Sequence, residues 1–474
     1  MELTLGEVAA TLGSSSQSSE QRVRGYSIDS RTVTPGQLFF AIRGPRFDGH
    51  KFVAQALERG AVGAVVNETY WQESPEGLRP SLIPVHETTK ALQQLGHWVR
   101  RQWGGRLIAI TGSTGKSTTK EMAAAILGQR YRVLKSQGNL NNHYGLPLTL
   151  LGIEPHHEVV VAELAMSGAG EIALLARLAV PQVGVVTNVA PVHLQYFDSV
   201  ESIGRAKREL VENLPAGATA ILNQDDPRVR QFRVGFPGRV VTFGFGEGSD
   251  YRAVEIRPDL MQGCHFRLQS PRLGGEYYVL VPGRHNVQNA VAAIAASSTM
   301  EISNEDVRQA LETFQPLAQR SEILTLPSGV VVINDCYNSN PLAMENMLET
   351  LANWPGARRR LVLAGEMLEL GPASPELHRA IGRKCRESGL DWLVAVQGDA
   401  QFLMDGAQGA GMPPERTRFF ASADDAADFC RSLLRPGDVV LVKGSRGVHL
   451  EKVVESLQTL NAGVQTVERA ERSG

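Results

Sequence analysis

Cysteine, long apolar runs and net charge are all scarce in this sequence, and each shortage excludes a class of protein. The four cysteines, Cys264, Cys336, Cys385 and Cys430, are scattered and form no CxxC pair. This spacing argues against a disulfide framework or a zinc site and fits a reducing cytoplasm. No apolar stretch approaches the ~20 residues that span a bilayer. The first residues, MELTLGEVAATLG, carry acids and glycine where a signal peptide has basic residues before an apolar run. We therefore expect a cytoplasmic protein without membrane insertion.

The charge balance is close to neutral, with a formal net charge of -2. Neither a nucleic acid nor a membrane surface is indicated as a partner. The 474 residues are 42% hydrophobic and 21% charged, which is ordinary for a globular protein with sizeable cores. At ~150 residues per domain this length predicts about three domains. No segment requires a second subunit, so a monomer is expected.

The chain divides into three stretches, and together they predict an α/β protein. Residues 1–103 contain short strand-like runs, LFFAI and AVGAVV, and QWGGR at 102–106 is interpreted as a hinge. Residues 104–315 contain the runs RLIAIT, EVVVAEL and QVGVVTNVA, which indicate a parallel sheet covered on both faces. A hairpin-like stretch follows, from VVTFGF to EYYVLVPG. Residues 316–474 alternate strands and helices again, as in a smaller, doubly wound Rossmann-like domain.

The last predicted helix, HLEKVVESLQTL, carries an apolar stripe and precedes a tail, VERAERSG, that we expect to fray. The stripe consists of Leu450, Val453, Val454, Leu457 and Leu460.

The segment TGSTGKSTTKEM, at 111–122, has the composition of a phosphate-binding loop. It lies between a strand, RLIAI, and a helix, KSTTKEMAAAIL, so backbone N–H groups and a helix dipole are available to phosphate oxygens. Gly112 and Gly115 allow close approach, Lys116 reaches β- and γ-phosphate oxygens, and Ser117 can ligate Mg²⁺. The loop is shorter than GxxxxGK[ST], because Ile110 occupies the first glycine position. Loops of this kind serve kinases, ATPases, switches and ligases alike.

Three charged or ionisable side chains fit a plain core poorly. Glu163 ends the strand EVVVAEL, at the sheet edge where ligands bind, although a cap or surface acid is the alternative. His193 follows another strand end and could meet Glu163 there, or be structural. Lys207 falls on the apolar face of the helix in SIGRAKRELVENL. It either extends its amine to solvent or is a desolvated amine of lowered pKa.

Polar clusters follow three further predicted elements. Asn286 and Asn289 open a helix and suit either capping or recognition of a base or ribose. Asp335, in NDCYNSNP, suits a turn or a ribose hydroxyl. Lys443, Ser445 and Arg446 follow a strand end, where an anionic substrate is slightly favoured over a salt bridge.

Taken in order, these segments resemble the Mur ligases, the ATP-dependent amide-forming enzymes that build the stem peptide of peptidoglycan. The resemblance covers nearly the whole chain. It is carried, in family order, by TGSTGKST, GNLNNHYGLPLTLL, Glu163, His193, AKREL, GRHNVQNA, QRSE and NDCYNSNP.

Three segments are similar to those of the family members that add the final dipeptide. They are IDSRTVTPGQLFFAIRGPRFDGHKF, NDCYNSNP and GEMLELGPASPELH, and no DNPR motif of the third-residue adders occurs. The sequence departs from the pattern at Ser167, Ala169, Gln195 and Tyr196. The resemblance implies a small α/β uridine-nucleotide-binding domain, a central P-loop ATPase-like domain and a C-terminal Rossmann-like domain.

The resemblance also implies a reaction: ATP-dependent joining of D-alanyl-D-alanine to UDP-N-acetylmuramoyl-tripeptide through an acyl phosphate. Residues Thr111, Gly112, Ser113, Thr114, Gly115, Lys116, Ser117, Thr118, Asn286, Asn289 and Asp335 would bind ATP. Two Mg²⁺ ions would be held by Ser117, Glu163, His193 and a Lys207 carbamylated by CO₂. Arg320 would approach the γ-phosphate, joining Lys116, Glu163, His193 and Lys207 as catalytic residues. Substrate contacts are expected at Ser30, Arg31, Asp48, Gly49, His50, Asn142, Tyr337, Asn338, Asn340, Lys443, Ser445 and Arg446.

Other functions remain open at this point. Another ligase of the superfamily, a third-residue adder or a folylpolyglutamate synthase, would share the same loop. A phosphotransferase would use the loop and Mg²⁺ on a hydroxyl substrate and would have no use for Lys207. A catalytically silent nucleotide-binding subunit would not need Lys116, Glu163, His193 and Lys207 together. Whether the third residue of the tripeptide is lysine or diaminopimelate is left open.

Overall fold

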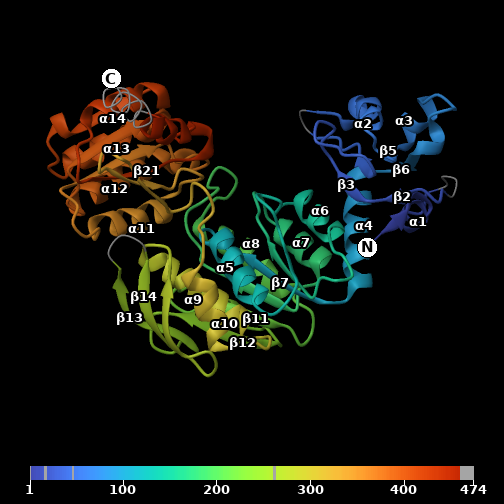
Figure 1. Ribbon diagram of the computed structural model, residues 1–474, viewed down its shortest axis with the longest axis horizontal. Helices are drawn as coiled ribbons and strands as arrows, with labels where there is room; N and C mark the ends of the chain where they lie inside the picture. The colour runs from blue at the N-terminus through green and yellow to red at the C-terminus, as the bar shows by residue number, and fades with distance from the viewer. Residues whose placement is uncertain (1, 15–18, 45–46, 260–262, 460–474) are drawn as a thin grey trace, which may run out of the picture.

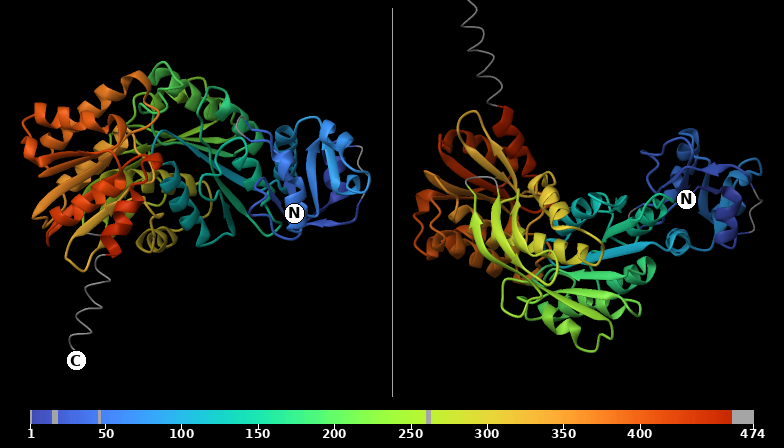
Figure 2. Two further views of the ribbon diagram at one scale, coloured as in Figure 1. Left: turned by 90° about the horizontal axis from the view of Figure 1, so that it is seen from above. Right: turned by 60° about the horizontal axis from the view of Figure 1, so that its bottom comes forward.

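The computed structural model describes residues 2–14, 19–44, 47–259 and 263–459. The chain forms an arc in which the N-terminal and C-terminal domains lie at opposite ends of a central domain (Figures 1 and 2). The expected α/β fold with three domains is confirmed. The domain boundaries taken from sequence pattern, at 103/104 and 315/316, stay predictions.

The first domain is built on a parallel sheet in the order β3-β4-β5-β6. Leu38 and Phe40 of β4 face the core shared with the central domain, whereas Phe39 faces a second, smaller core. This alternation follows from the period of two along a strand. The elements are β1 (Leu3–Thr4), α1 (Leu5–Thr11), β2 (Arg22–Val23), β3 (Gly25–Ser27), β4 (Gln37–Phe40), α2 (Val53–Glu58), β5 (Gly63–Asn67), α3 (Glu68–Glu73) and β6 (Leu82–Val85).

Helix α4 (Thr88–Trp103) joins the first domain to the central one. Its buried stripe, which includes Leu92, Leu95 and Val99, packs in one continuous core with Leu38 of the first domain and Leu146 of the central domain. The predicted hinge at 102–106 is therefore partly helix, since only Gly104 and Gly105 lie between α4 and the next strand. Gly104 ends the helix with a left-handed backbone, φ 67°.

The central sheet has the order β15-β14-β13-β12-β11-β10-β7-β9-β8. From β7 the chain passes first to β8 and β9 on one side and then to β10 and β11 on the other. The carboxyl end of β7 is therefore a topological switch point, where open α/β sheets bind ligands. The strands are β7 (Arg106–Thr111), β8 (Val133–Lys135), β9 (Val159–Glu163), β10 (Val183–Val186), β11 (Thr219–Asn223), β12 (Arg239–Gly244), β13 (Tyr251–Pro258), β14 (Cys264–Gln269) and β15 (Gly275–Val279).

Both faces of this sheet are covered by helices, as the continuous apolar runs predict. Leu107 and Ala109 of β7 face one core, and Ile108 and Ile110 face the other. The helices are α5 (Lys116–Gly128), α6 (Gly145–Leu151), α7 (Glu171–Ala179), α8 (Val200–Glu212), α9 (Arg284–Ser297) and α10 (Asn304–Glu312). The hairpin interpretation is correct for β13, β14 and β15, which are antiparallel, but β12 pairs in parallel with β11 and β13.

The third domain has a sheet in the order β16-β17-β21-β18-β19-β20, parallel except for β16. Leu361 and Leu363 face one core and Val362 the other, so this sheet is also covered on both faces. Strands β16 (Glu322–Thr325) and β20 (Thr417–Phe420) were not predicted. The other elements are β17 (Val331–Asn334), α11 (Pro341–Ala352), β18 (Arg359–Gly365), α12 (Ser374–Glu387), β19 (Trp392–Val396), α13 (Gln401–Gly409), α14 (Ala423–Leu433) and β21 (Asp438–Lys443).

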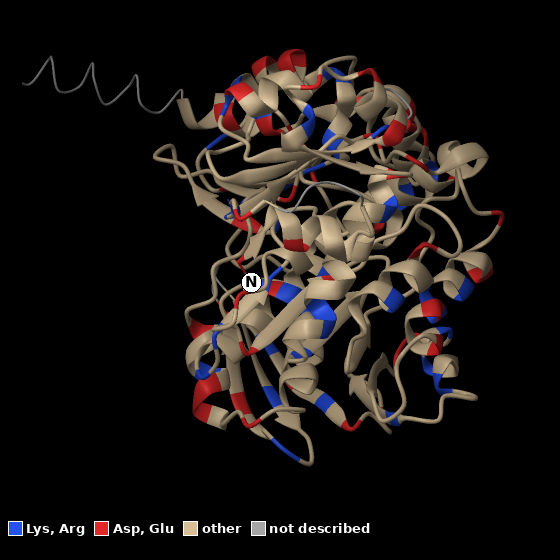
Figure 3. Cartoon of the chain, turned by 90° about the vertical axis from the view of Figure 1, so that its right-hand side faces the viewer, with Lys and Arg blue, Asp and Glu red and all other residues tan. Residues whose placement is uncertain are grey.

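The described part of the last predicted helix is helical at 451–459 and buries Val453, Val454 and Leu457. Leu460 and the tail lie outside the described residues. All four cysteines are free and buried. Basic and acidic residues are interspersed over the face in Figure 3, and no described helix is long and apolar enough to cross a membrane.

Candidate active site

The phosphate-type loop leaves β7 at Thr111 and enters α5 at Lys116. Gly115 has φ 78°, and a Cβ there would lie 2.2 Å from Asn289 Oδ1; at Gly112 it would lie 1.8 Å from Thr187 Oγ1. Neither position therefore accepts a side chain. The first turn of α5 is left without a side-chain cap, so its N–H groups are available to an anion.

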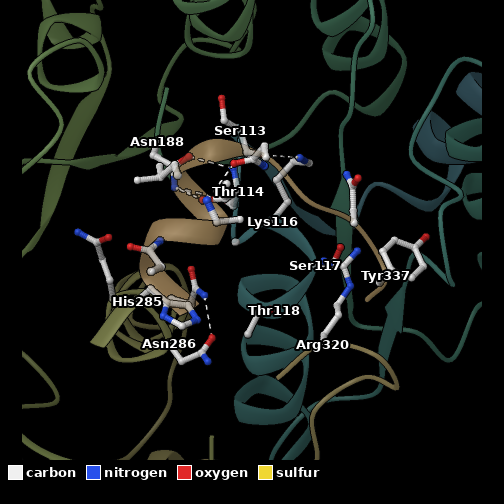
Figure 4. Close-up of a pocket in the computed structure, with 18 of the residues that line it drawn as sticks. Ser113, Thr114, Lys116, Ser117, Thr118, Asn188, His285, Asn286, Arg320 and Tyr337 are labelled. Carbon is white, nitrogen blue, oxygen red and sulfur yellow. Dashed lines mark hydrogen bonds between the residues drawn. The ribbon is translucent and has the colours of Figure 1, made fainter. Parts of the chain in front are cut away.

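Lys116 folds back over this loop, donating from Nζ to Gly112 O at 2.9 Å and to Ser113 O at 3.3 Å. Burial lowers its pKa, Glu163 opposes that change, and Arg320 adds to it. Asn188, just after β10, fixes the loop by accepting from Thr114 N at 2.9 Å (Figure 4). The loop conformation is thus fixed by contacts with neighbouring residues of the chain.

Glu163, at the end of β9, is buried among groups that donate to it. Ser117 Oγ donates to Oε2 at 2.6 Å, and Asn141 Nδ2 donates to Oε1 at 2.8 Å. Within the described residues no cluster of three or more His, Cys, Asp or Glu side chains could hold a metal. A carboxylate beside hydroxyl oxygens instead fits Mg²⁺, which uses one or two carboxylates together with substrate phosphates.

Lys207, on α8, is 2% exposed. Burial first, and then the nearby Lys116 ammonium, lower its pKa well below the ordinary lysine value. Of the two sequence interpretations, the desolvated amine therefore describes this side chain. A neutral amine is a nucleophile, which an ammonium is not.

His193 lies on the loop after β10 and lines the same cleft as the phosphate loop. Its backbone is left-handed, with φ 56°. Its Nδ1 lies 2.5 Å from Glu369 Oε2, and Glu369 belongs to the third domain. The hydrogen bond to His193 lowers the pKa of Glu369.

At the start of α9, Asn286 and Asn289 are buried and bonded to each other, Asn289 Nδ2 to Asn286 Oδ1 at 3.2 Å. Asn286 Nδ2 also donates to Pro282 O. Gly283 occupies the N-cap position of α9 and Asn286 lies inside the helix, so Asn286 is not its capping residue. Burial lowers the pKa of neighbouring His285 to about 4, although the Asp335 carboxylate acts in the opposite direction and raises it.

The third domain closes the other side of the cleft. Arg320 stacks on Tyr337, its Cζ 4.2 Å from the ring centroid, and Arg446 lies at 5.5 Å from the same ring. Asp335 pairs with Lys443 Nζ at 2.5 Å and accepts from Ser321 N at 2.8 Å. The salt bridge disfavoured at Lys443 from sequence is therefore present, and it engages the carboxylate expected to meet a ribose.

A cleft of about 520 Å³ gathers these groups between the central and third domains. Its lining includes Ser113, Thr114, Gly115, Lys116, Ser117, Thr118, Glu163, His193, Asn286, Asn289, Arg320, Asp335, Tyr337, Asn338, Asn340 and Lys443. Of the residues predicted in these two domains, six do not line it: Thr111, Gly112, Asn142, Lys207, Ser445 and Arg446. Asn142 Oδ1 accepts from Tyr144 N and Gly145 N, and Ser445 Oγ from Leu368 N.

The five residues predicted to contact a uridine nucleotide lie in the first domain, away from this cleft. His50 is buried, with Asp48 at Nδ1 and Asn67 N at Nε2. Ser30 donates to Gln55, and a Cβ at Gly49 would meet Ile42 at 2.7 Å. These contacts are internal to the first domain and hold its loops in place. Arg31, in contrast, is exposed and pairs with Asp29.

Sequence reasoning missed several cleft residues. Asn141 and Asn188 are amides within otherwise ordinary loops, although Asn141 lies in the family-like segment GNLNNHYGLPLTLL. His285 precedes Asn286 directly and was not considered. Glu369 does not line the cleft and lies in the segment GEMLELGPASPELH, but no sequence pattern indicates its pairing with His193, 176 residues away.

Comparisons with known proteins cover all three domains. Three family models match: "Mur ligase family, catalytic domain" at 22–100, "Mur ligase middle domain" at 110–297 and "Mur ligase, glutamate ligase domain" at 319–446. The UDP-N-acetylmuramoyl-tripeptide–D-alanyl-D-alanine ligase of Bacillus subtilis is 34% identical over 92% of this chain and 93% of the relative.

Two solved structures are similar over more than nine-tenths of the chain. MurF from Acinetobacter baumannii has a TM-score of 0.87 and 32% identity, covering 97% of this chain and 99% of the other. The MurF ligase of Thermotoga maritima in complex with ADP has a TM-score of 0.80 and 27% identity, covering 92% and 97%.

Proposed function

The chain belongs to the Mur ligase family, and from that premise we propose that it joins D-alanyl-D-alanine to UDP-N-acetylmuramoyl-tripeptide at the expense of ATP. The product is UDP-N-acetylmuramoyl-pentapeptide, for peptidoglycan synthesis in the cytoplasm. The observation that carries this proposal is end-to-end similarity to ligases of that name, together with a phosphate loop in a cleft between two domains. Whether the enzyme acts as a monomer stays a prediction.

The reaction needs activation, because a carboxylate and an amine do not condense usefully at neutral pH. The terminal carboxylate of the tripeptide attacks the γ-phosphorus of ATP, and the bond to ADP breaks. The free amine of the dipeptide then attacks the acyl carbon, and phosphate leaves with the amide formed and a proton released. The protein contributes positioning and neutralisation of charge.

The central domain holds the triphosphate. Lys116 leaves its two loop carbonyls, at 2.9 and 3.3 Å, and turns its amine to phosphate oxygens. The N–H groups of the loop bind further oxygens. Ser117 or Thr118 with Glu163 would hold one Mg²⁺ and His193 a second. When bound, Mg²⁺ neutralises the charge on phosphate and acyl oxygens.

Lys207 has a role that a buried lysine otherwise lacks. Burial lowers the pKa of Lys207 and so favours the neutral amine, which can add to CO₂ and lose a proton to give a carbamate. The carbamate is an oxygen ligand that can hold or orient the second Mg²⁺. The adjacent Lys116 ammonium favours this anion over the original cation.

The third domain supplies the remaining contacts. Arg320 reaches the γ-phosphate from its place beside Tyr337 as the domain closes. Asn286, Asn289 and Asp335 recognise the nucleoside, the last only after it exchanges Lys443 for a ribose hydroxyl. Tyr337, Asn338, Asn340, Lys443, Ser445 and Arg446 form the dipeptide side, and Ser30, Arg31, Asp48, Gly49, His50 and Asn142 the UDP-substrate side.

The test is phosphate release from ATP and Mg²⁺ with each substrate alone and with both together. Ligation predicts sustained release only with both, and a new amide product by mass. A phosphotransferase would instead phosphorylate a hydroxyl compound and leave the dipeptide unchanged, which would overturn the proposal.

A further inference from the structure

A short loop of the central domain contacts the third domain beside the phosphate cleft. His193 Nδ1 lies 2.5 Å from Glu369 Oε2, and Gln195 N donates to Glu369 O at 3.1 Å. Gly371 lies so close that a Cβ there would be 3.1 Å from Leu194 O. The two backbones are therefore docked together, and the side-chain contact is aligned by the backbone contact.

The backbone at this junction adopts costly conformations on both sides. His193 and Glu369 are left-handed, with φ 56° and 63°, as are Gln319 and Ser321 in the connection to the third domain, with φ 62° and 54°. Such conformations are strained for residues other than glycine and cluster at switch regions. Ser321 is held by Asp335 and Gln319 by Glu322.

Little stability follows from the His193–Glu369 pair itself. Its side chains are 28% and 44% exposed, and ion pairs so open to solvent contribute little to the free energy of unfolding. What the pair does fix is the ring of His193. A carboxylate at Nδ1 favours the tautomer that has its proton on Nδ1, and in that tautomer the lone pair of Nε2 is available to a ligand.

We propose that Glu369 is a positioning residue that makes His193 ready to bind metal only when the third domain is docked. The proposal rests on the proposed function for the metal role of His193. Glu369 does not touch substrate; it acts through the histidine ring across the domain junction. Closure and metal-site assembly are thereby one event.

The experiment uses the full-length protein with Glu369→Ala and Glu369→Gln. The control is Glu451→Gln, which alters a second His–Glu pair, His449 Nδ1 to Glu451 Oε1 at 3.1 Å, lying within the third domain alone. The first readout is ¹⁵N NMR of histidine-labelled protein without Mg²⁺ or ATP, with the His193 signals identified from His193→Gln. We expect the Nδ1–H form in the parent and control, and a tautomer mixture in Glu369→Ala.

The second readout is the Mg²⁺ concentration that gives half-maximal ligation. Removing the carboxylate that orients the His193 ring should raise this concentration about tenfold in Glu369→Ala, less in Glu369→Gln, and not in the control. The KM for ATP at saturating Mg²⁺ should change little. An unaltered His193 tautomer, an unaltered Mg²⁺ requirement, or faster turnover in Glu369→Ala would each overturn the proposal. If the parent protein fails to ligate at all, the proposed function fails instead.

Discussion

Lys207 is an ordinarily charged side chain in apolar surroundings. Substituting it tests whether its amine forms the proposed carbamate. Lys207→Ala should abolish ligation, because no carbamate can form there. The measurement is phosphate release with both substrates, before and after adding bicarbonate. Lys452→Ala, which removes an exposed lysine paired with Asp424, is the control and should behave as the parent. Near-normal turnover in Lys207→Ala would refute the carbamate role.

Arg320 is expected to act on turnover rather than on ATP binding. Arg320→Ala should lower kcat roughly a hundredfold, the usual effect of losing one donor to transition-state charge, with a much smaller change in KM for ATP. Arg308→Ala is a matched control, since Arg308 also stacks on a tyrosine, Tyr277, but remote from the cleft. A loss confined to ATP affinity would contradict the closure role of Arg320.

His285 should make stability fall in mild acid. Its pKa in the folded chain is about 4, below the ordinary value of 6.5, because burial disfavours the imidazolium. Between these values the unfolded state binds the extra proton, so this contribution is complete above pH 6.5 and is lost as pH falls toward 4. As pH falls from 7.5 to 4, the melting temperature of His285→Gln should decline less steeply than that of the parent. Parallel curves of melting temperature against pH for the two proteins would contradict the prediction.

At the residue scale, sequence could identify side chains whose type conflicts with their local pattern. Glu163 and Lys207 are charged residues within apolar periodicities, and both are buried in the structure. Lys443 and Asp335 each looked available for ligands, because nothing in sequence shows that residues 108 positions apart will pair. For the same reason, the pairing of Glu369 with His193 could not be predicted.

At the scale of one element, the turn into α5 depends on the absence of a side chain at Gly115. Gly115→Ala should cost about 1–2 kcal/mol from the left-handed backbone alone, and its Cβ would displace Asn289. We expect weaker ATP binding by calorimetry and a lower melting temperature. Gly128 lies at the other end of α5, where an added Cβ would meet no neighbouring group within 4 Å. Gly128→Ala should therefore be neutral or slightly stabilising. Equal ATP affinity in both variants would contradict this.

Elements with strong periodicity were predicted well, and edge elements were not. Strands β7, β9 and β10 are continuous apolar runs and could be located from sequence. Strands β16 and β20 lie at the two edges of the third sheet, where short, half-exposed segments such as EILT and TRFF carry no distinct pattern. The direction of β12 depends on its neighbours, not on its own residues.

For the whole molecule, the shared core predicts two unfolding units rather than three. Leu95→Ala on α4 should cost ~2–5 kcal/mol and lower one calorimetric transition that contains both the first and the central domain. Leu393→Ala, an equally buried leucine of the third domain, should lower a separate transition. Three independent transitions, or one response to both changes, would contradict this division.

Helix α4 also fixes the distance between the first domain and the central domain. Its 16 residues span about 24 Å at ~1.5 Å per residue, and packing at both ends keeps that length constant. If the first domain binds the nucleotide of the substrate, as proposed, the far end of the substrate lies at a fixed distance from the phosphate loop. A stem one residue short or long would bring the wrong atom to the loop. On that proposal, the length of α4 selects substrates by the length of the stem peptide, without a separate contact to each of its residues.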